Sequence, residues 1–277
     1  MKTKHLFNKI YVLLVWFCGL IGLILPFWIV GYLLYHGIRV ISLSFLFDRP
    51  RGFPLGSSGG IFPALQGSFS LILIGLLIAL PAGIGGAIYL AEFLKNQRFK
   101  RTARWIIESM AAVPSILYGL FGYAFFVVTL SMGISLLAGG LVLAMVMFPI
   151  ILITSHEALE AVPSEYREAT FALGVDRTEW ILKILLRKTW SRILAGVVLA
   201  VGHAVGSASP VLFTASVYYT PGGFNLFHPV MTLPTHLYYL VAEAISFDQA
   251  YGTALILVLG LFVFNIAAMI LRRYLKE

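Results

Sequence analysis

Residues able to hydrogen-bond or to break a helix lie between positions 203 and 214, inside one of the most apolar parts of the sequence. His203 and Ser207 stand four residues apart, so on a helix they share one face. A neutral imidazole and a hydroxyl can bind an oxyanion through hydrogen bonds and still release it, as a transport path requires. The alternative is that His203 hydrogen-bonds a backbone carbonyl between helices. If this face lines a translocation path through a membrane, Ser209, Pro210 and Thr214 extend it.

Charged residues gather in a second region, between positions 164 and 190. The pattern predicts two short amphipathic helices that meet at Gly174, with Asp176 as the N-cap of the second and Glu179 three residues on. Two roles fit this pattern. The helices lie in the membrane interface with basic residues on lipid headgroups, or they form a rigid knob that docks a soluble partner.

Several kinds of chemistry lack the residues that they need. Cys18 is the only cysteine, so neither a disulfide nor a Cys-based metal site is expected. His228 and His236 do not have the spacing of metal ligands. The sequence contains no Gly-x-x-x-x-Gly-Lys-Ser/Thr phosphate loop and no motif of a hydrolase triad. We therefore expect no enzyme, and no metal or cofactor bound by this chain.

Membrane-spanning helices must position these residues. Apolar residues make up 60% of the chain and charged residues 12%, against about 25% charged in soluble proteins. Helices are expected because the apolar runs are too long for barrel strands and do not alternate. We predict an all-α integral membrane protein with six transmembrane helices, each long enough for a hydrocarbon layer of about 30 Å. The runs are roughly 10–37, 67–93, 106–130, 133–154, 191–217 and 250–271.

The basic residues predict the orientation. With six spans, 17 of the 20 Lys and Arg residues lie on one side, and only Arg39, Arg49 and Arg51 lie on the other. Short cytoplasmic loops collect Lys and Arg, so both termini and the charged region are expected in the cytoplasm. The net charge of +8 is thereby explained without a nucleic-acid partner. The first run lacks a small-residue cleavage site, so we expect it to be retained.

The charged region resembles the EAA loop of ATP-binding-cassette importer permeases, which reads Glu-Ala-Ala, three residues, Gly, nine residues, Ile, one residue, Leu, Pro. Thr170 replaces the second Ala and Arg187 replaces the Pro. Without that proline, the second helix is expected to run on toward the next span. The resemblance implies a coupling loop at about 156–190 that docks a cytoplasmic ATPase. Its expected contact residues are Glu168, Ala169, Gly174, Val175, Asp176 and Trp180.

Three further segments resemble the PstA-type permease subunit of bacterial phosphate importers. They begin "GGIFPALQG", "AAVPSILYG" and "ASPVLFTA", and the resemblance covers about 59–273. It implies a MetI-like permease domain at 59–277, after a transmembrane helix and an external loop at 1–58, in the bacterial plasma membrane. The implied partners are a second homologous permease, two cytoplasmic ATPases that hydrolyse ATP with Mg, an external phosphate-binding protein and membrane lipid.

The same resemblance adds Pro114 and Ser115 to the predicted path; for Pro114 the alternative is a helix kink alone. Where the family typically has Arg and Glu, this chain has His203 and Ser207. Losing both avoids leaving one charge alone in lipid. Phosphate remains the leading substrate; another oxyanion and, with less support, a secondary transporter are alternatives. Close helix packing is predicted at two glycine pairs, Gly202 with Gly206 and Gly119 with Gly122.

Overall fold

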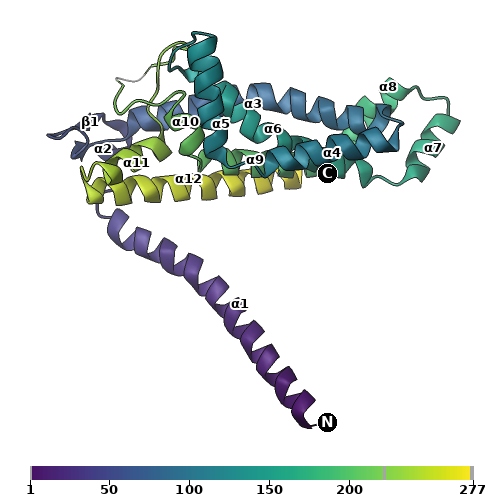
Figure 1. The fold of residues 1–277 in the computed structure, drawn as a ribbon, viewed down its shortest axis with the longest axis horizontal. Coiled ribbons are helices and arrows are strands. Elements are labelled where there is room, and N and C mark those ends of the chain that lie inside the picture. Colours follow the sequence, from purple (N-terminus) through teal and green to yellow (C-terminus); the bar gives the residue numbers. More distant parts are fainter. Residues whose placement is uncertain (1, 221–222, 275–277) are drawn as a thin grey trace.

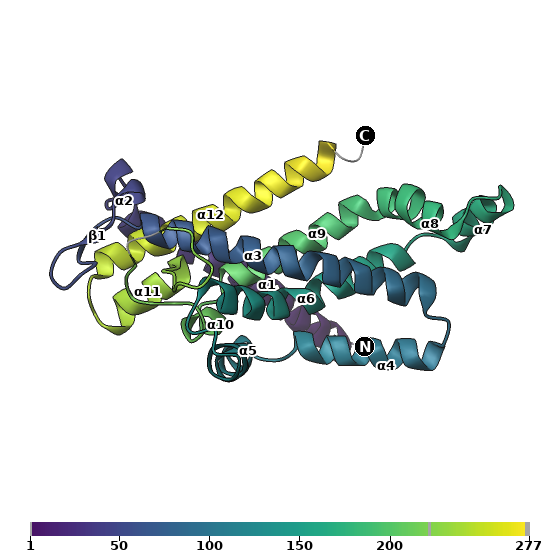
Figure 2. The same ribbon diagram turned by 90° about the horizontal axis from the view of Figure 1, so that it is seen from above.

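In a computed structural model that describes residues 2–220 and 223–274, the chain folds almost entirely into helices (Figure 1). Helices α3, α6 and α9 pack together, and α12 contacts α9 but diverges from it toward its C-terminal end (Figure 2). The predicted helical class is confirmed. The elements are α1 Lys2–Gly37, α2 Leu43–Phe47, β1 Pro50–Arg51, β2 Ser58–Gly59, α3 Phe62–Ile88, η1 Tyr89–Phe93, α4 Gln97–Ala111, α5 Ser115–Gly122, η2 Tyr123–Thr129, α6 Leu136–Glu160, α7 Ser164–Ala172, α8 Arg177–Glu179, η3 Trp180–Leu185, α9 Leu186–Val205, α10 Ser209–Leu212, α11 Leu233–Ala242 and α12 Phe247–Tyr274.

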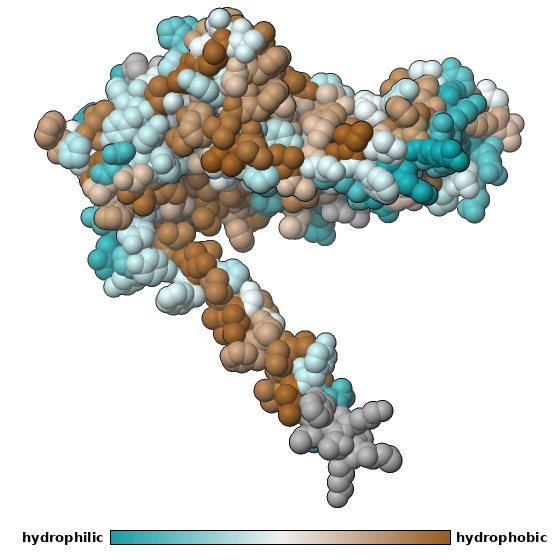
Figure 3. Space-filling model, viewed as in Figure 1, coloured by the Kyte–Doolittle hydropathy of each residue, from teal (hydrophilic) through white to brown (hydrophobic). Residues whose placement is uncertain are grey.

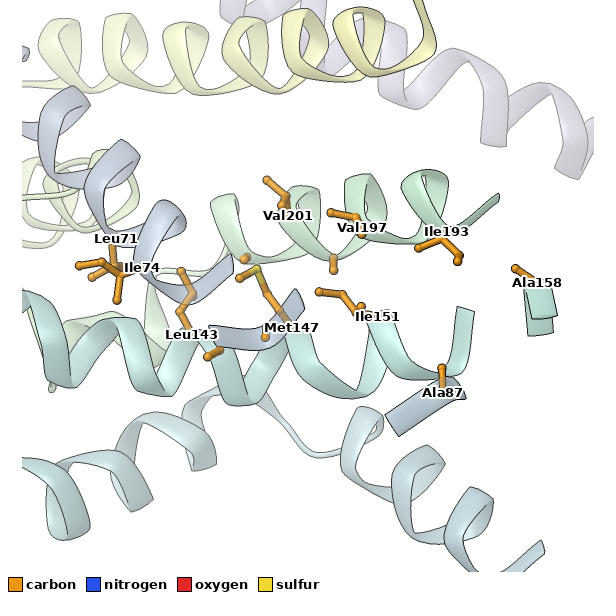
Figure 4. Packing of buried hydrophobic residues seen from close by; sticks show 14 of the residues in the cluster. Leu71, Ile74, Ala87, Leu143, Met147, Ile151, Ala158, Ile193, Val197 and Val201 are labelled. Atoms are coloured by element: carbon orange, nitrogen blue, oxygen red, sulfur yellow. The ribbon is translucent and has the colours of Figure 1, made fainter. Parts of the chain in front are cut away.

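The core forms where α6 packs against both α3 and α9 (Figure 4). Met147 and Ile151 of α6 are fully buried, and Leu143 is 1% exposed. Because lipid is as apolar as these side chains, close packing rather than removal from water holds the helices together. Their partners on the neighbouring helices include Leu71, Ile74, Ile193, Val197 and Val201.

Four helical segments are long and apolar enough to cross a membrane, and a bent pair of helices makes a possible fifth. Among the described residues, these segments match four of the six predicted runs, the third run is the bent pair, and the fifth corresponds to α9, which is helical but is not one of these candidates. The four segments are Asn8–Gly37, Phe62–Phe93, Leu136–Glu160 and Phe247–Ile270.

A proline divides the third run. Pro114 has no N–H and keeps Val113 out of the helical region, so α4 ends at Ala111 and α5 begins at Ser115. The segment Ser115–Thr129, made of α5 and η2, turns by 90° from α4. This run is thus a bent pair of helices rather than one straight helix.

The observed helix α9 differs from the fifth predicted run at both ends. Helix α9 ends at Val205 and is followed by Gly206, and the short α10 starts only at Ser209. Because Arg187, Lys188 and Arg192 lie in the first turns of α9, the helix is less apolar than the predicted run.

Close helix packing at glycine occurs at one of the two predicted pairs. A methyl group at Gly119 would lie 2.8 Å from the carbonyl oxygen of Ser209, and one at Gly122 would overlap Val142, so this pair is confirmed. A methyl group at Gly202 would meet nothing within 4 Å among the described residues, and Gly206 faces only its own helix. The prediction for packing of Gly202 and Gly206 within this chain is therefore wrong.

Within the part of α1 whose side chains are described, contact with the rest of the chain occurs only near the end of the helix. The hydroxyls of Tyr32 and Tyr251 are 3.2 Å apart, and the His36 ring lies 4.3 Å and 5.0 Å from these two rings, centre to centre. The preceding part of the apolar segment Asn8–Gly37 runs away from the bundle (Figure 1), and the face drawn in Figure 3 is mostly apolar. Its surface thus suits lipid or another membrane helix.

Short elements close the bundle where α1 joins it, and we call this the hairpin end. Strands β1 and β2 pair antiparallel, and Ser216 forms a parallel bridge with Val230. The Tyr218 hydroxyl donates to the Leu55 carbonyl. Thr232 caps α11 through a capping box. His236 of α11 is 3% exposed, and its Nδ1 has no hydrogen-bond partner among the described residues.

Burial lowers the pKa of His236 from 6.5 to about 4. Between these values the unfolded chain binds a proton that the folded chain does not, so the free energy of unfolding falls as the pH drops through this window. A difference of about 2.5 units corresponds to a loss of about 3 kcal/mol. Denaturation of the purified chain from pH 7 to pH 4 should show this loss. We expect His236→Gln to weaken the dependence of the free energy of unfolding on pH. His228→Gln, at an exposed histidine, should retain that dependence. The same pH dependence in the parent and both variants would contradict the prediction.

Candidate functional site

Residues 164–185 form a protrusion at the end of the bundle opposite the hairpin end, and we call it the charged elbow (Figure 1). Its first limb, α7, ends at Ala172, and Gly174 turns the chain with a φ of +78°. Asp176 then caps the second limb by accepting the Glu179 N–H at 2.7 Å. Leu173 at the tip is 83% exposed. Both predicted helices and the turn at Gly174 are confirmed.

The second limb is continuous with a long helix. The backbone stays helical from α8 through the π-helical η3 into α9, including at Leu185 and Leu186. The predicted continuation past Arg187, where the family has proline, is therefore confirmed.

The residues expected to contact an ATPase divide into two groups. Five lie on the elbow surface, with Val175 half-buried and the others exposed: Glu168, Ala169, Gly174, Val175 and Asp176. Trp180 is only 2% exposed and packs in the main core, with its ring edge-on to Phe171. Trp180 thus supports the elbow from beneath, whereas the other five are available to a partner.

Contacts from η1 hold the elbow on the bundle. Glu92 Oε2 lies 3.2 Å from Nη2 of Arg167 in α7, and the side chain of Glu92 is 7% exposed. The guanidinium of Arg177 in α8 lies 4.3 Å from the centre of the Phe93 ring. Sequence reasoning missed Glu92 and Phe93 because they lie far from the elbow in the chain. An acidic residue at the end of an apolar run was the one available signal.

The predicted path residues do not form one continuous surface. His203 is exposed on the last turn of α9, and its carbonyl accepts the Ser207 hydroxyl at 2.9 Å. Ser207 is half-buried and borders a cavity of about 10 Å³, which also touches Ser68 and Thr232. His203 and Ser207 are thus neighbours, but Ser207 follows the helix end.

The remaining path residues lie at the start of α5 or pack against it. Pro210 packs against Gly119 of α5, and Thr214 is fully buried with its hydroxyl donating to the Pro210 carbonyl at 2.8 Å. Ser209 contributes its carbonyl to the same contact with Gly119. Pro114 is exposed before α5 and Ser115 is half-buried at its start. Thr214 therefore supports α10 rather than facing an open path.

No group of three or more His, Cys, Asp or Glu residues within 2–220 and 223–274 could hold a metal ion. His228 is exposed on the loop before α11, whereas His236 is buried within that helix.

Comparison with known proteins identifies the family. Residues 79–277 match the model of the binding-protein-dependent transport system inner membrane component. The chain is 31% identical to the probable ABC transporter permease protein YqgI of Bacillus subtilis, covering 90% of each chain. It is 35% identical to the phosphate transport system permease protein PstA of Haemophilus influenzae, covering 85% of this chain and 82% of the relative.

Solved structures share the fold at low sequence identity. A chain of the bacterial alginate ABC transporter, in complex with an alginate pentasaccharide-bound periplasmic protein, superposes with a TM-score of 0.66 at 15% identity, over 98% of this chain and 95% of that one. A chain of the inward-facing MetNI methionine ABC transporter gives 0.63 at 19% identity, over 79% and 95%. With its apolar spanning helices and its elbow, the chain belongs to the family of binding-protein-dependent transport system inner membrane components and is a relative of the PstA permeases.

Proposed function

We propose that this chain is the transmembrane permease subunit of an ATP-driven importer of inorganic phosphate. The observation that carries the proposal is the exposed charged elbow, with its turn at Gly174, in a chain that is 30% to 35% identical to several PstA permeases. The chain forms half of the translocation path and couples it to cytoplasmic ATPases. Hydrolysis of ATP with Mg belongs to those partners, so this chain is not an enzyme and binds no cofactor.

The proposed assembly contains a second homologous permease, two ATPases and an external phosphate-binding protein. We propose no nucleic-acid partner. The family supports partners of the ATPase and binding-protein kind. Helix α1 is exposed along its apolar length, so lipid and the second permease are its expected neighbours. We retain 1–58 and 59–277 as the proposed division of the chain.

Reconstitution tests the function. The chain is co-expressed with a homologous permease and an ATPase encoded nearby, and the complex is placed in vesicles with the phosphate-binding protein outside. We expect phosphate uptake only when ATP is present on the ATPase side. Uptake by the lone chain without ATP would instead support a secondary transporter. Uptake of sulfate but not phosphate would assign another oxyanion.

The proposed orientation places the elbow and both termini in the cytoplasm and the hairpin end outside. Single reporter cysteines at Leu173 and Gly223, in a Cys18→Ser background, should be labelled only from inside and only from outside, respectively, because a charged maleimide does not cross lipid. Both positions are exposed. The reversed pattern in intact cells would overturn the orientation and, with it, ATPase docking at the elbow.

His203 and Ser207 are the proposed contacts of the anion. Removing a hydrogen bond to a charged group is expected to lower uptake by about tenfold in His203→Ala or Ser207→Ala complexes. Ser109→Ala is a matched control, because the exposed Ser109 hydroxyl also donates to a carbonyl of its own helix, at 2.7 Å. Uptake should be measured at equal expression and assembly. Parent-like uptake in both His203→Ala and Ser207→Ala would leave these side chains with a packing role only.

A further inference from the structure

We propose that Glu92 and Phe93 are positioning residues that hold the charged elbow at a set angle to helix α3. We call the contacts of Glu92 with Arg167 and of Phe93 with Arg177 the clamp. The clamp is a property of this chain alone, whereas its consequence for transport rests on the proposed function. Both residues lie in η1, where the helix widens by one residue per turn and Leu94 N–H bonds to the Tyr89 carbonyl at 3.0 Å. Such π-helical turns redirect side chains and are frequent at functional sites.

The ion pair holds the first limb of the elbow. The Glu92 side chain is 7% exposed and that of Arg167 is 40% exposed. A buried carboxylate is costly without a cationic partner, and Arg167 supplies that partner from another helix. The arrangement with Arg167 against η1 is therefore favoured over arrangements in which α7 swings free.

An aromatic contact holds the second limb on the same helix turn. The Arg177 guanidinium stacks on the Phe93 ring at 4.3 Å, a distance at which the charge is attracted to the ring face. Adjacent residues of η1 thus each bind one arginine, one from each side of Gly174. Because both limbs meet the same short segment, the angle between them is also constrained.

The two limbs are linked to each other as well. Arg167 lies 5.7 Å from the Phe171 ring centre, and that ring meets the buried Trp180 ring edge-on at 6.3 Å. Contacts therefore run from η1 through Arg167 and Phe171 to the second limb, and return to η1 through Arg177. Because each limb contacts both η1 and the other limb, neither limb can rotate without breaking contacts of the other.

The clamp joins the elbow to the opposite end of the molecule. Segment Phe62–Phe93 is helical throughout, so η1 is the end of the helix that begins at the hairpin end. There, Ser68 Oγ accepts the Leu233 N–H at 2.8 Å and Gln66 Oε1 accepts the Gly223 N–H at 3.2 Å. One helix thus contacts Gly223 and Leu233 of the hairpin end at one end and the elbow at the other.

Distance measurements on the full chain in nanodiscs test the clamp without any partner. Spin labels are placed at Leu173 and Phe99, which are 83% and 61% exposed, in a Cys18→Ser background. We expect one narrow distance distribution for the parent and distributions at least about twice as broad for Glu92→Gln and Arg167→Gln. Arg167→Lys, which retains the charge, should restore most of the narrow distribution. Parent-like widths in Glu92→Gln and Arg167→Gln would overturn the proposal.

A matched control separates the clamp from general loss of an ion pair. Glu179→Gln removes the Glu179–Lys183 pair, which lies within the second limb and is exposed at both residues. Its distance distribution should match the parent. Broadening equal to that of Glu92→Gln would show general sensitivity of the elbow and contradict the specific role of η1.

Binding of the ATPase gives the functional readout. We expect the affinity of the purified ATPase for Glu92→Gln to fall about tenfold, since a mobile elbow must be ordered on docking. The affinity for Glu108→Gln, which removes the exposed Arg104–Glu108 pair outside the elbow, should stay within about twofold. If the parent itself bound no ATPase, the proposed function would fail, and the distance distributions would still decide the clamp. Parent-like affinity of Glu92→Gln together with a broad distribution would overturn the link between clamp and docking.

Discussion

Gly174→Val is expected to lower ATP-driven uptake by at least about tenfold while the chain still inserts and assembles with its second permease. Gly174 has a φ of +78°, and a side chain there would meet nothing within 4 Å. The cost is therefore in the backbone, where a left-handed residue other than glycine costs about 1–2 kcal/mol, and a β-branched residue fits least well. We expect residue 174 to leave the left-handed conformation, which changes the angle between the two limbs of the elbow. The surface that an ATPase would bind is thereby lost.

Two variants identify the cause of that loss. Gly174→Asn should retain most of the uptake, because asparagine tolerates positive φ better than other side chains. Gly85→Val makes the same change on α3, where a side chain also meets nothing within 4 Å and the backbone is helical, and it should behave like the parent. ATPase stimulation is measured beside uptake. Normal stimulation in Gly174→Val would exclude the elbow as the docking element.

Gly196→Val is expected to destabilise the bundle by about 3 kcal/mol or more, the upper range for overpacking a close contact. A methyl group at Gly196 would lie 2.6 Å from Cβ of Thr154, at the interface of α9 and α6. Thr154 has little freedom to move aside, since its hydroxyl donates to the Ile150 carbonyl at 2.8 Å and its side chain is branched at Cβ. The helices must therefore separate, which opens the contacts around Ile193 and Val197.

Gly202→Val is the matched control on the same helix, because that position is open within the chain. Its thermal stability in detergent should stay within about 0.5 kcal/mol of the parent, as for substitutions that touch nothing. Unfolding is followed by near-ultraviolet circular dichroism of the isolated chain. If Gly202→Val proved as destabilising as Gly196→Val, the assignment of the close contact to Gly196 would be wrong.

The sequence predicted those features that depend on neighbours along the chain. Composition and long apolar runs are enough for membrane helices, because backbone groups in lipid must be paired within the segment. The elbow was equally local: Gly174 allows the positive φ, and Asp176 caps the next helix from three residues away. The replacement of a proline by Arg187 correctly indicated that the second limb runs on into α9.

Features that depend on distant partners were not predictable in this way. Periodicity could not distinguish Gly202, which is open, from Gly196, which touches Thr154, because only the facing helix decides which glycine is close-packed. Counting apolar residues treated the third run as one span, although Pro114 turns it by 90°. The direction of that turn depends on the packing of α5 against α10 and α6.

The sequence by itself determined the helical membrane class, the charged elbow and its turn, since each follows from composition or from residues a few positions apart. Tertiary structure alone decided that Trp180 is buried beneath the elbow, that Thr214 is fully buried, and that Glu92 meets Arg167. The physical reason is that burial and ion pairing are properties of segments brought together by helix packing, and a carboxylate at the end of an apolar run does not specify which distant arginine will neutralise it.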